Sequence, residues 1–179
     1  MKILVTGGTG FIGSHTVVAL LEEGHEVVIA DNLVNSQRNV VTKIKRITGV
    51  KPFFYKVDVA DKKSMRKVFS EHKFDAVIHF AGLKAVSESV QKPLLYYRNN
   101  LDSTLTLLEL MKEFDVKNIL FSSSATVYGT PENVPLKEED PIGGTTNPYG
   151  TTKLIIEQIL MDFVHANEGF KAVSLRYFN

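Results

Sequence analysis

The sequence contains no cysteine and no tryptophan among its 179 residues. Without cysteine, neither a disulfide framework nor a metal site built on thiolates can form. Long hydrophobic runs are also missing. The apolar stretch at the start of the chain covers only residues 3–5, whereas a signal-peptide core needs roughly 7–15 apolar residues and a membrane span needs ~20. These absences predict a soluble, cytoplasmic protein that does not enter a membrane.

An excess of charge of either sign is absent as well. The chain has 21 Lys and Arg against 20 Asp and Glu, which gives a formal net charge of +1. This balance provides no field that would attract nucleic acid or an acidic membrane. The histidines show neither ligand spacing nor a carboxylate partner pattern, so we expect no bound metal; they are His15, His25, His72, His79 and His165.

Short apolar segments alternate with longer amphipathic ones along the whole chain. The pattern predicts strands at Lys2–Thr6, Glu26–Asp31, Lys51–Val57, Asp75–Phe80, Asn118–Ser122 and Lys171–Tyr177. It predicts helices at Phe11–Glu23, Arg38–Ile47, Lys62–His72, Leu94–Phe114 and Tyr149–Asn167. The strands are nearly continuously apolar, which is typical of parallel strands covered by helices on both faces. We therefore expect an α/β fold with a doubly wound parallel sheet in three layers, α/β/α.

A glycine-rich turn joins the first strand to the first helix. Gly7, Gly10 and Gly13 leave room for a tight turn, for close approach of a pyrophosphate and for close packing of helix on strand. The following helix N-terminus offers free amides and a partial positive charge to phosphates. The glycines alone are a weak signal, but the next strand ends in the acidic residue Asp31, about 20 positions on. Together they predict a Rossmann-like dinucleotide site.

Asp31 also indicates which dinucleotide is bound. A carboxylate at this position can accept hydrogen bonds from the adenosine ribose, and such bonds to a charged group are worth about 1.5–3 kcal/mol. It would repel a ribose 2′-phosphate, so we expect NAD rather than NADP. The alternative is that Asp31 only forms the turn at the end of its strand.

The rest of the chain bears on domain organisation. The one long irregular stretch, 125–148, holds four of the six prolines, and loops of this length in a compact domain are functional or disordered. The final segment, 171–179, has the pattern of a strand with nothing after it. We therefore expect residues 1–179 to form one NAD-binding domain of a longer protein, with a small C-terminal substrate domain absent.

Tyr149 and Lys153 lie four residues apart at the start of a predicted helix and share one face. A free tyrosine has a pKa of about 10. A lysine ammonium about 4 Å away is worth up to ~4 kcal/mol at an effective dielectric near 20. The positive nicotinamide ring of NAD acts in the same direction, and together they would bring the phenol near pH 7, where a general base works best. The serines 122–124 follow the fifth strand, so Ser122 and Ser124 can face the nicotinamide, with Ser124 bonded to the substrate oxygen. Ser123 is expected only to satisfy strand-end backbone groups.

These motifs, in this order, make the chain resemble the extended short-chain dehydrogenase/reductase family. The resemblance covers the whole chain and is carried by 6–13, 58–59, 80–82, Asn99, the serines and the Tyr149/Lys153 pair. It is closest to the branch that epimerises UDP-glucose at C4, through residues 31–33, 81–86, 122–129 and 177–179. The resemblance implies an isomerase that interconverts UDP-glucose and UDP-galactose through a 4-keto sugar, with tightly held NAD and Tyr149 as base.

The resemblance also assigns roles to residues that match the family's motifs. Those expected to bind the cofactor, besides the glycines and Asp31, are Phe11, Ile12, Asn32, Asn35, Ser36, Asp58, Val59, Phe80, Ala81, Gly82, Lys84, Asn99, Ser122, Ser124, Tyr149, Lys153, Tyr177 and Phe178. Those expected to bind substrate are Ser124, Tyr149, Phe178 and Asn179. Simpler interpretations stay open for several, since Asp58 can start a turn, Phe80 can be core, and Asn35 and Ser36 can cap a helix.

Three further alternatives concern function and assembly. Ala125 and Thr126 cannot exchange a proton usefully, which disfavours elimination of water and hence a sugar-nucleotide dehydratase. Another sugar-nucleotide epimerase or reductase of the family, or a catalytically silent NAD-binding module, remains possible, and this segment alone is expected to be inactive. Leu101, Leu105 and Leu108 predict an apolar helix face that belongs to the core, although the family often forms homodimers through helices in this region.

Overall fold

The computed structural model describes residues 1–131 and 134–178, and the elements alternate as the sequence predicts. The strands are β1 (Lys2–Thr6), β2 (Glu26–Asp31), β3 (Phe53–Lys56), β4 (Ala76–His79), β5 (Asn118–Ser124) and β6 (Lys171–Tyr177). The helices are α1 (Phe11–Glu22), α2 (Asn39–Thr48), α3 (Lys62–Glu71), α4 (Val86–Gln91), α5 (Pro93–Glu113) and α6 (Pro148–Ala166), with a 3₁₀ turn η1 (Ala125–Tyr128).

The strands form one parallel sheet in the order β3-β2-β1-β4-β5-β6. The chain first winds outwards from β1 to β3 and then returns to place β4 on the other side of β1. This reversal creates a switch point between β1 and β4, and ligands of open α/β sheets bind at the carboxyl ends of the strands at such a point. A ligand is therefore expected next to the residues that follow Thr6 and His79, where β1 and β4 end.

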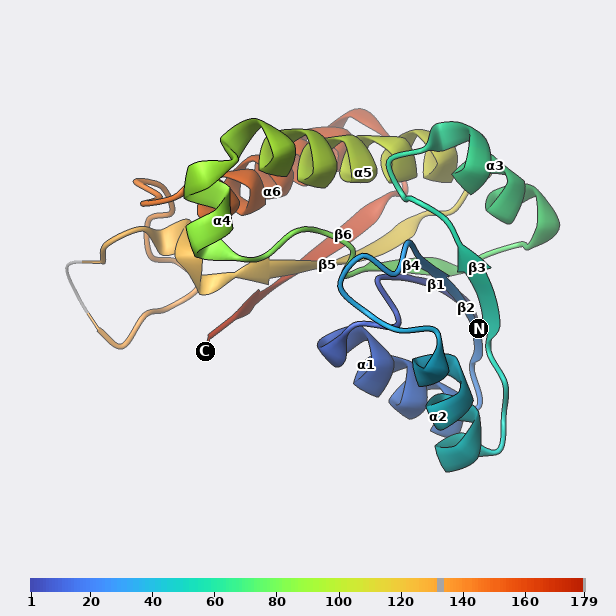
Figure 1. The fold of residues 1–179 in the computed structure, drawn as a ribbon. Coiled ribbons are helices and arrows are strands. Elements are labelled where there is room, and N and C mark those ends of the chain that lie inside the picture. The colour runs from blue at the N-terminus through green and yellow to red at the C-terminus, as the bar shows by residue number, and fades with distance from the viewer. Residues whose placement is uncertain (132–133, 179) are drawn as a thin grey trace.

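Helices cover the two faces of the sheet in separate groups (Figure 1), with α1 and α2 on one face and α3, α5 and α6 on the other. Successive side chains of β1 point to opposite faces of the sheet and contribute to both cores. Ile3 and Val5 pack with α1 and α2, whereas Leu4 packs into the larger core on the other face. Burial of such side chains is worth about 1.5–3 kcal/mol each. The predicted three-layer doubly wound fold is confirmed.

The expectation that every strand is covered on both faces is wrong for β6. Its burial alternates along the strand, and Val173 and Leu175 are 53% and 40% exposed. The helices α1 and α2 lie over the other end of the sheet, and no helix of the described residues packs on this face of β6. The apolar pattern of β6 was therefore misleading about its cover.

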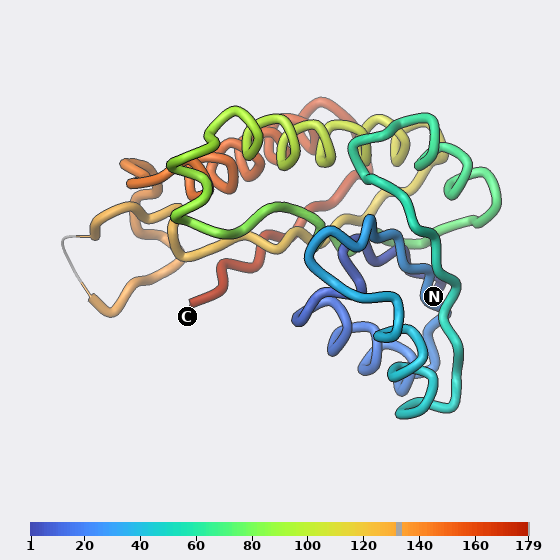
Figure 2. The backbone as a smooth tube through the Cα atoms, in the orientation of Figure 1, coloured from blue at the N-terminus to red at the C-terminus, as the bar shows by residue number. Residues whose placement is uncertain are grey.

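Two short elements were not predicted from the sequence. The helix α4 forms just before Pro93, and the 3₁₀ turn η1 occupies the start of the predicted loop. The described residues of the rest of that connection, 129–131 and 134–147, extend from the end of the sheet where β5 and β6 finish (Figure 2). Of the predicted apolar face of α5, Leu108 is buried and Leu101 packs against the core, whereas Leu105 is 43% exposed. No helix in residues 1–131 and 134–178 is long and apolar enough to cross a membrane.

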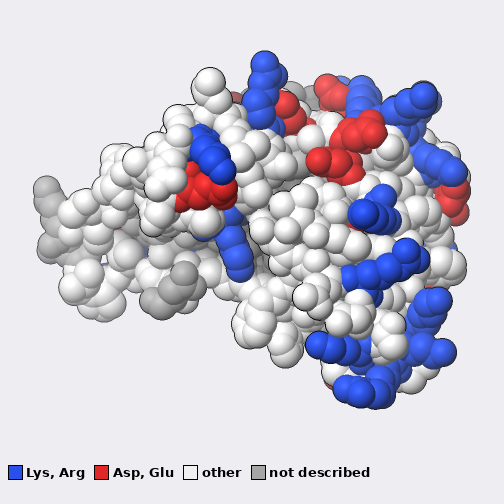
Figure 3. All heavy atoms as spheres, viewed as in Figure 1, with Lys and Arg blue, Asp and Glu red and all other residues white. Residues whose placement is uncertain are grey.

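Lys and Arg gather over α2 on the face shown in Figure 3. Two of them, Lys45 and Arg46, lie in the last turn of that helix. Cations are favourable there because the helix C-terminus carries a partial negative charge. The local excess of positive charge therefore has a structural explanation within the helix itself.

Candidate functional site

The glycine turn has the tight geometry that the sequence predicts. Gly7 has a positive φ of 68°, and a Cβ added at Gly13 would lie 2.3 Å from the carbonyl oxygen of Gly7. Because a real Cβ cannot approach backbone so closely, the start of α1 can pack on the turn only with glycine there. The first α-helical hydrogen bond runs from Ser14 N to Gly10 O. The amides of Phe11 and Ile12 therefore face out of the helix end, where an anion can accept from them.

The segment after β4 lies directly against this turn. A Cβ added at Gly7 would be 2.7 Å from the amide nitrogen of Ala81. The Ala81 amide donates to Thr6 Oγ1 at 3.3 Å, and the Phe80 amide donates to Thr6 O at 3.1 Å. Gly82 follows with a φ of 157°. The structure thus brings Ala81 and Gly82 beside the glycine turn, at the switch point of the sheet.

Asp31 ends β2 next to the same turn and is buried. Its Oδ2 accepts from the Thr9 amide at 3.1 Å, and its Oδ1 accepts from the Leu33 amide at 2.9 Å and from Ser36 Oγ at 3.1 Å. A carboxylate has about four acceptor positions, so about one is left for a ribose. Binding through both ribose hydroxyls therefore requires the Ser36 hydroxyl to turn away.

Asn32 and Asn35 lie in the same loop, exposed or half-buried. The Asn32 side chain accepts from the Val34 amide at 3.1 Å. Neither Asn35 nor Ser36 caps the next helix, because α2 begins after Arg38 without a side-chain cap. The helix-capping alternative is therefore wrong, and Ser36 instead bonds Asp31 and, at 2.7 Å, Thr9 Oγ1.

Other predicted cofactor residues have local structural roles. Asp58 is exposed and accepts from the Ala60 amide at 2.9 Å, as a turn former does. Val59 is buried in the larger core, and Phe80 packs partly against the smaller one. Lys84 is exposed and makes no ion pair within the described residues. Asn99 is half-buried in α5. The cofactor roles of these residues stay predictions.

Tyr149 and Lys153 lie in the first turns of α6, which starts where the side chain of Asn147 accepts from the Gly150 amide at 2.9 Å. Lys153 is 6% exposed, and its ammonium donates to Ser122 O at 2.7 Å. The same nitrogen lies 4.7 Å from the centroid of the Phe121 ring and 5.7 Å from that of the Tyr149 ring. Lys153 thus points inwards, between the end of β5 and the phenol.

Burial shifts the pKa values of both side chains. Burial lowers the pKa of Lys153 to about 8, because the ammonium loses hydration. Burial raises the pKa of Tyr149 above its usual value, and interaction with the Ser124 hydroxyl lowers it by less. The protein groups around Tyr149 therefore do not by themselves bring the phenol towards neutrality, because loss of hydration has the largest effect on its pKa. That Lys153 and the nicotinamide together lower the pKa of the phenol stays a prediction.

The serines 122–124 do not follow the fifth strand, as the sequence predicted, but form the last three residues of β5 and pair with β6. Their roles also differ from the prediction. Ser123 was expected to satisfy a strand-end backbone group, but its hydroxyl donates to the carboxylate of Glu157. Ser124 does form a local bond, since its Oγ accepts from the Thr126 amide at 3.2 Å and caps η1. Ser122 contributes its carbonyl to Lys153. A charged partner on α6 explains Ser123, and no sequence spacing pointed to it.

The end of β6 lies beside the serines. Tyr177 pairs with Ser124 in the parallel ladder and is half-buried. Phe178 is 62% exposed, with its ring centroid 6.3 Å from that of Tyr128. Asn179, a predicted substrate residue, lies outside the described residues. The structure therefore brings Tyr177 beside Ser124 and leaves Phe178 exposed at the end of the strand.

Asn100 was missed from the sequence although it joins two parts of the site. Its Oδ1 accepts from the Leu83 amide at 2.8 Å, and its Nδ2 donates to Leu83 O and to Thr152 Oγ1, both at 3.0 Å. It is 2% exposed. The available signal was an amide side chain on the same helix face as Tyr96 and Leu107, both of which are buried. Asn100 holds the loop after β4 against α6 one residue before Lys153.

These features define a nucleotide-binding α/β domain with a Ser/Tyr/Lys centre at the carboxyl edge of its sheet. The family model described as "NAD dependent epimerase/dehydratase family" matches residues 3–179. The chain belongs to this family.

Close relatives are named UDP-glucose 4-epimerases. The chain is 56% identical over 179 residues to that of Yersinia enterocolitica and 54% identical to that of Bacillus subtilis. All of the chain is covered in both comparisons, against 53% and 52% of the relatives. The chain therefore spans about half the length of the curated relatives it matches.

Solved structures give the same result for the fold. The UDP-glucose 4-epimerase of Bifidobacterium longum, in complex with NAD⁺ and UDP, is 55% identical with a TM-score of 0.99, over 100% of this chain and 53% of that one. The enzyme of Stenotrophomonas maltophila, with bound NAD and formylated UDP-arabinopyranose, is 45% identical with a TM-score of 0.96, over the same shares.

Proposed function

We propose that this chain is the NAD-binding part of a UDP-glucose 4-epimerase, which interconverts UDP-glucose and UDP-galactose through a 4-keto sugar. The observation that carries the proposal is the placement of Lys153, Tyr149 and Ser124 at the carboxyl edge of the sheet, the edge at which the glycine turn also lies. The names of relatives above 50% identity support the same activity.

The residues present fit NAD. The turn at Gly7 and Gly13 is a cradle that a Cβ would fill, and the amides of Phe11 and Ile12 face the space where a pyrophosphate would lie. Asp31 would hold the adenosine ribose and repel a 2′-phosphate. Tyr177, paired with Ser124, would flank the nicotinamide end. The chemistry that NAD supplies when bound is reversible acceptance of a hydride from C4 of the sugar.

Tyr149 is the proposed base for the sugar 4-hydroxyl. Burial raises the pKa of this phenol, so the protein groups alone keep it protonated near pH 7. The positive charge of oxidised nicotinamide would then act with the Lys153 ammonium to favour the phenolate. Ser124 would orient the C4 oxygen, and Tyr149 would return the proton to it after the sugar has turned over. Lys153 stays fixed by Ser122 O throughout.

The reaction class follows from what lies next to Ser124. A dehydratase needs an acid/base side chain to eliminate water after oxidation, and here the following residues are Ala125 and Thr126. Oxidation at C4 followed by reduction therefore completes the reaction. The runner-up is epimerisation of another UDP-sugar, because this chain spans only about half the length of its curated relatives. A silent NAD-binding module would have no use for the buried Lys153.

A second copy of the protein is the proposed partner for α4 and α5. Apolar side chains along these two helices are open to solvent: Val86, Val90, Leu94, Leu95 and Leu105. A homodimer through this face would bury them. Sedimentation of the native protein should show a dimer that Leu94→Glu dissociates, whereas a monomeric wild type contradicts the proposal.

The activity is tested by incubating the native protein with UDP-galactose and no added NAD. Formation of UDP-glucose is expected, because a cofactor regenerated in every cycle need not be supplied. The 179-residue chain by itself is expected to bind NAD without converting the sugar. A native protein that binds NAD but forms no UDP-glucose would leave only the nucleotide-binding module.

A further inference from the structure

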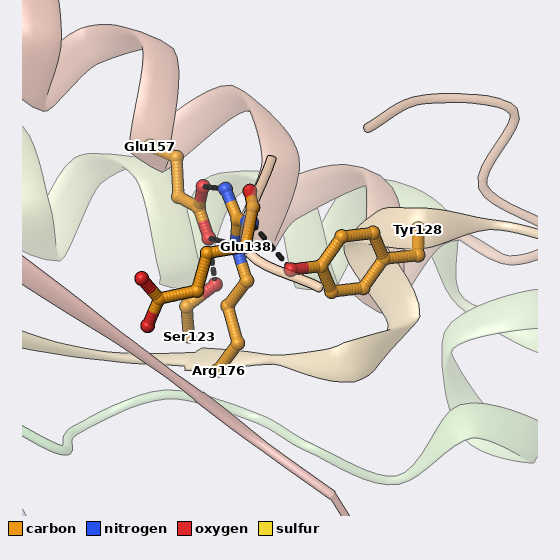
Figure 4. Close-up of polar contacts among 5 residues, drawn as sticks. All are labelled: Ser123, Tyr128, Glu138, Glu157 and Arg176. Atoms are coloured by element: carbon orange, nitrogen blue, oxygen red, sulfur yellow. Dashed lines mark hydrogen bonds and ion pairs between the residues drawn. The ribbon is translucent and has the colours of Figure 1, made fainter. Parts of the chain in front are cut away.

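An ion pair between a buried carboxylate and a mostly buried guanidinium, 21% exposed, lies behind the catalytic centre. The proposed function gives no role to either residue. Glu157 is 4% exposed in α6, and its carboxylate receives two bonds from the guanidinium of Arg176 in β6, at 3.1 and 2.8 Å. The Ser123 hydroxyl donates to the same carboxylate. The Arg176 guanidinium also donates to the Tyr128 hydroxyl at 2.7 Å and lies over that ring (Figure 4).

This cluster of Glu157, Arg176, Ser123 and Tyr128 joins four segments. Ser123 comes from β5, Arg176 from β6, Glu157 from α6 and Tyr128 from η1. Ser123 and Arg176 are also direct partners in the parallel ladder. The guanidinium reaches the connection after η1 as well, since it donates to Glu138 O at 3.4 Å. One carboxylate thus holds together the ends of two strands and a helix.

Three members of the cluster lie within one helical turn or one residue, along the chain, of a residue of the proposed reaction. Ser123 lies between Ser122, whose carbonyl holds Lys153, and Ser124. Glu157 is one helical turn after Lys153, on the same side of α6. Arg176 precedes Tyr177. A change in how α6 sits on β5 would therefore move the Lys153 ammonium and the phenol relative to Ser124.

The chemistry of the pair favours a positional role. Two buried charges gain little stability over well-packed apolar side chains of similar volume, because both must lose their hydration. What the pair does provide is direction: a planar guanidinium and a carboxylate joined by two bonds have one favoured relative orientation. Interaction with Glu157 raises the pKa of Arg176, so the charge is permanent.

We propose that Glu157 and Arg176 are positioning residues, which act through Ser123 and Tyr128 to set the spacing between Tyr149 and Lys153 on α6 and Ser124 on β5. The proposal rests on the proposed function. If the proposal is correct, turnover depends on the relative orientation of Glu157 and Arg176. Folding depends only on side chains that fill the same space.

The test replaces the pair by apolar side chains of similar length. In the native protein, Glu157→Met/Arg176→Met is expected to melt near the wild-type temperature and to retain NAD. Its kcat should fall about 100-fold, the scale of a ~1 Å misplacement at a reacting centre, with KM little changed. The acid limb of the pH profile should move upwards, because a displaced Lys153 favours the phenolate less. The matched control is Arg66→Met/Glu113→Met, which removes an exposed pair between α3 and α5.

A second variant tests the proposal even if the double variant does not fold. Arg176→Lys keeps the charge but cannot make both bonds to the carboxylate, so about a 10-fold lower kcat with the same upward shift of the acid limb is expected. A folded double variant, or a folded Arg176→Lys, with the kcat and pH profile of the wild type overturns the proposal. If the wild type itself fails to convert UDP-galactose, the proposed function fails first and the positioning role fails with it.

Discussion

His79 contacts Thr6, the residue before the glycine turn, and its protonation affects the stability of the fold in acid. The hydrogen-bond partners of the ring determine which nitrogen carries the proton. It is 1% exposed at the end of β4, with Nδ1 2.7 Å from Thr6 Oγ1 and Nε2 3.1 Å from Thr104 Oγ1. Thr104 donates its own hydroxyl proton to Asn100 O, so it must accept from His79 Nε2. Nδ1 is then the acceptor for the Thr6 hydroxyl. The ring is neutral, with its proton on Nε2.

Protonation of this ring costs folding free energy. Burial, with a smaller contribution from the charge of Lys153, lowers the pKa of His79 from 6.5 to about 3. A group whose pKa is lower in the folded state gives stability that is present above the unfolded value and is lost as the pH falls towards the folded one. With these two pKa values, the free energy of unfolding should fall by about 2 kcal/mol between pH 7 and pH 5.

His79→Asn tests this value. The Asn amide oxygen can take the place of Nδ1 as acceptor for Thr6, so the variant should fold, although less stably at every pH because its bond to Thr104 is lost. The free energies of unfolding are measured in urea at pH 7, 6 and 5 for both proteins. The wild type should lose about 2 kcal/mol more than the variant between pH 7 and pH 5. Parallel losses would refute the assignment of a neutral, buried histidine.

Three further substitutions test the site. Tyr149→Phe should lower turnover by several orders of magnitude (roughly 10²–10⁴ from the lost base) and leave NAD bound, as judged by the nucleotide released on denaturation. Lys153→Met should abolish most activity while the melting temperature stays equal or rises, since a buried ammonium with a pKa of about 8 is removed; a large fall in melting temperature would contradict that. Asp31→Asn should weaken the binding of NAD about 10- to 100-fold, because hydrogen bonds to a charged group are lost. The ratio of the affinities for NAD and NADP, measured by titration calorimetry, should also become smaller.

The arrangement of the sheet and the phosphate turn could be predicted from the sequence because local patterns determine them. The alternation of apolar strands with amphipathic helices leads to a parallel sheet, and the glycines between β1 and α1 act through the backbone of their own segment. The tight contact between Gly13 and Gly7 O is the physical reason for that spacing. Such features need no knowledge of distant contacts.

What could not be predicted depends on which segments meet across the sheet. Ser123 bonds Glu157, 34 residues away, and Asn100 bonds Thr152, 52 residues away. Val173 is exposed because α1 and α2 cover the other end of the sheet. The sequence of β6 alone cannot reveal which strands those helices cover. The raised pKa of Tyr149 likewise results from burial that a four-residue spacing does not reveal.

The central claim is that the hydrogen removed from C4 of the sugar returns to C4. It is tested most directly with UDP-galactose carrying deuterium at C4, incubated with the native protein in ordinary water. The account expects UDP-glucose that retains the deuterium at C4, with Tyr149→Phe forming it far more slowly. Deuterium lost to water, or found at another carbon of the product, would contradict it.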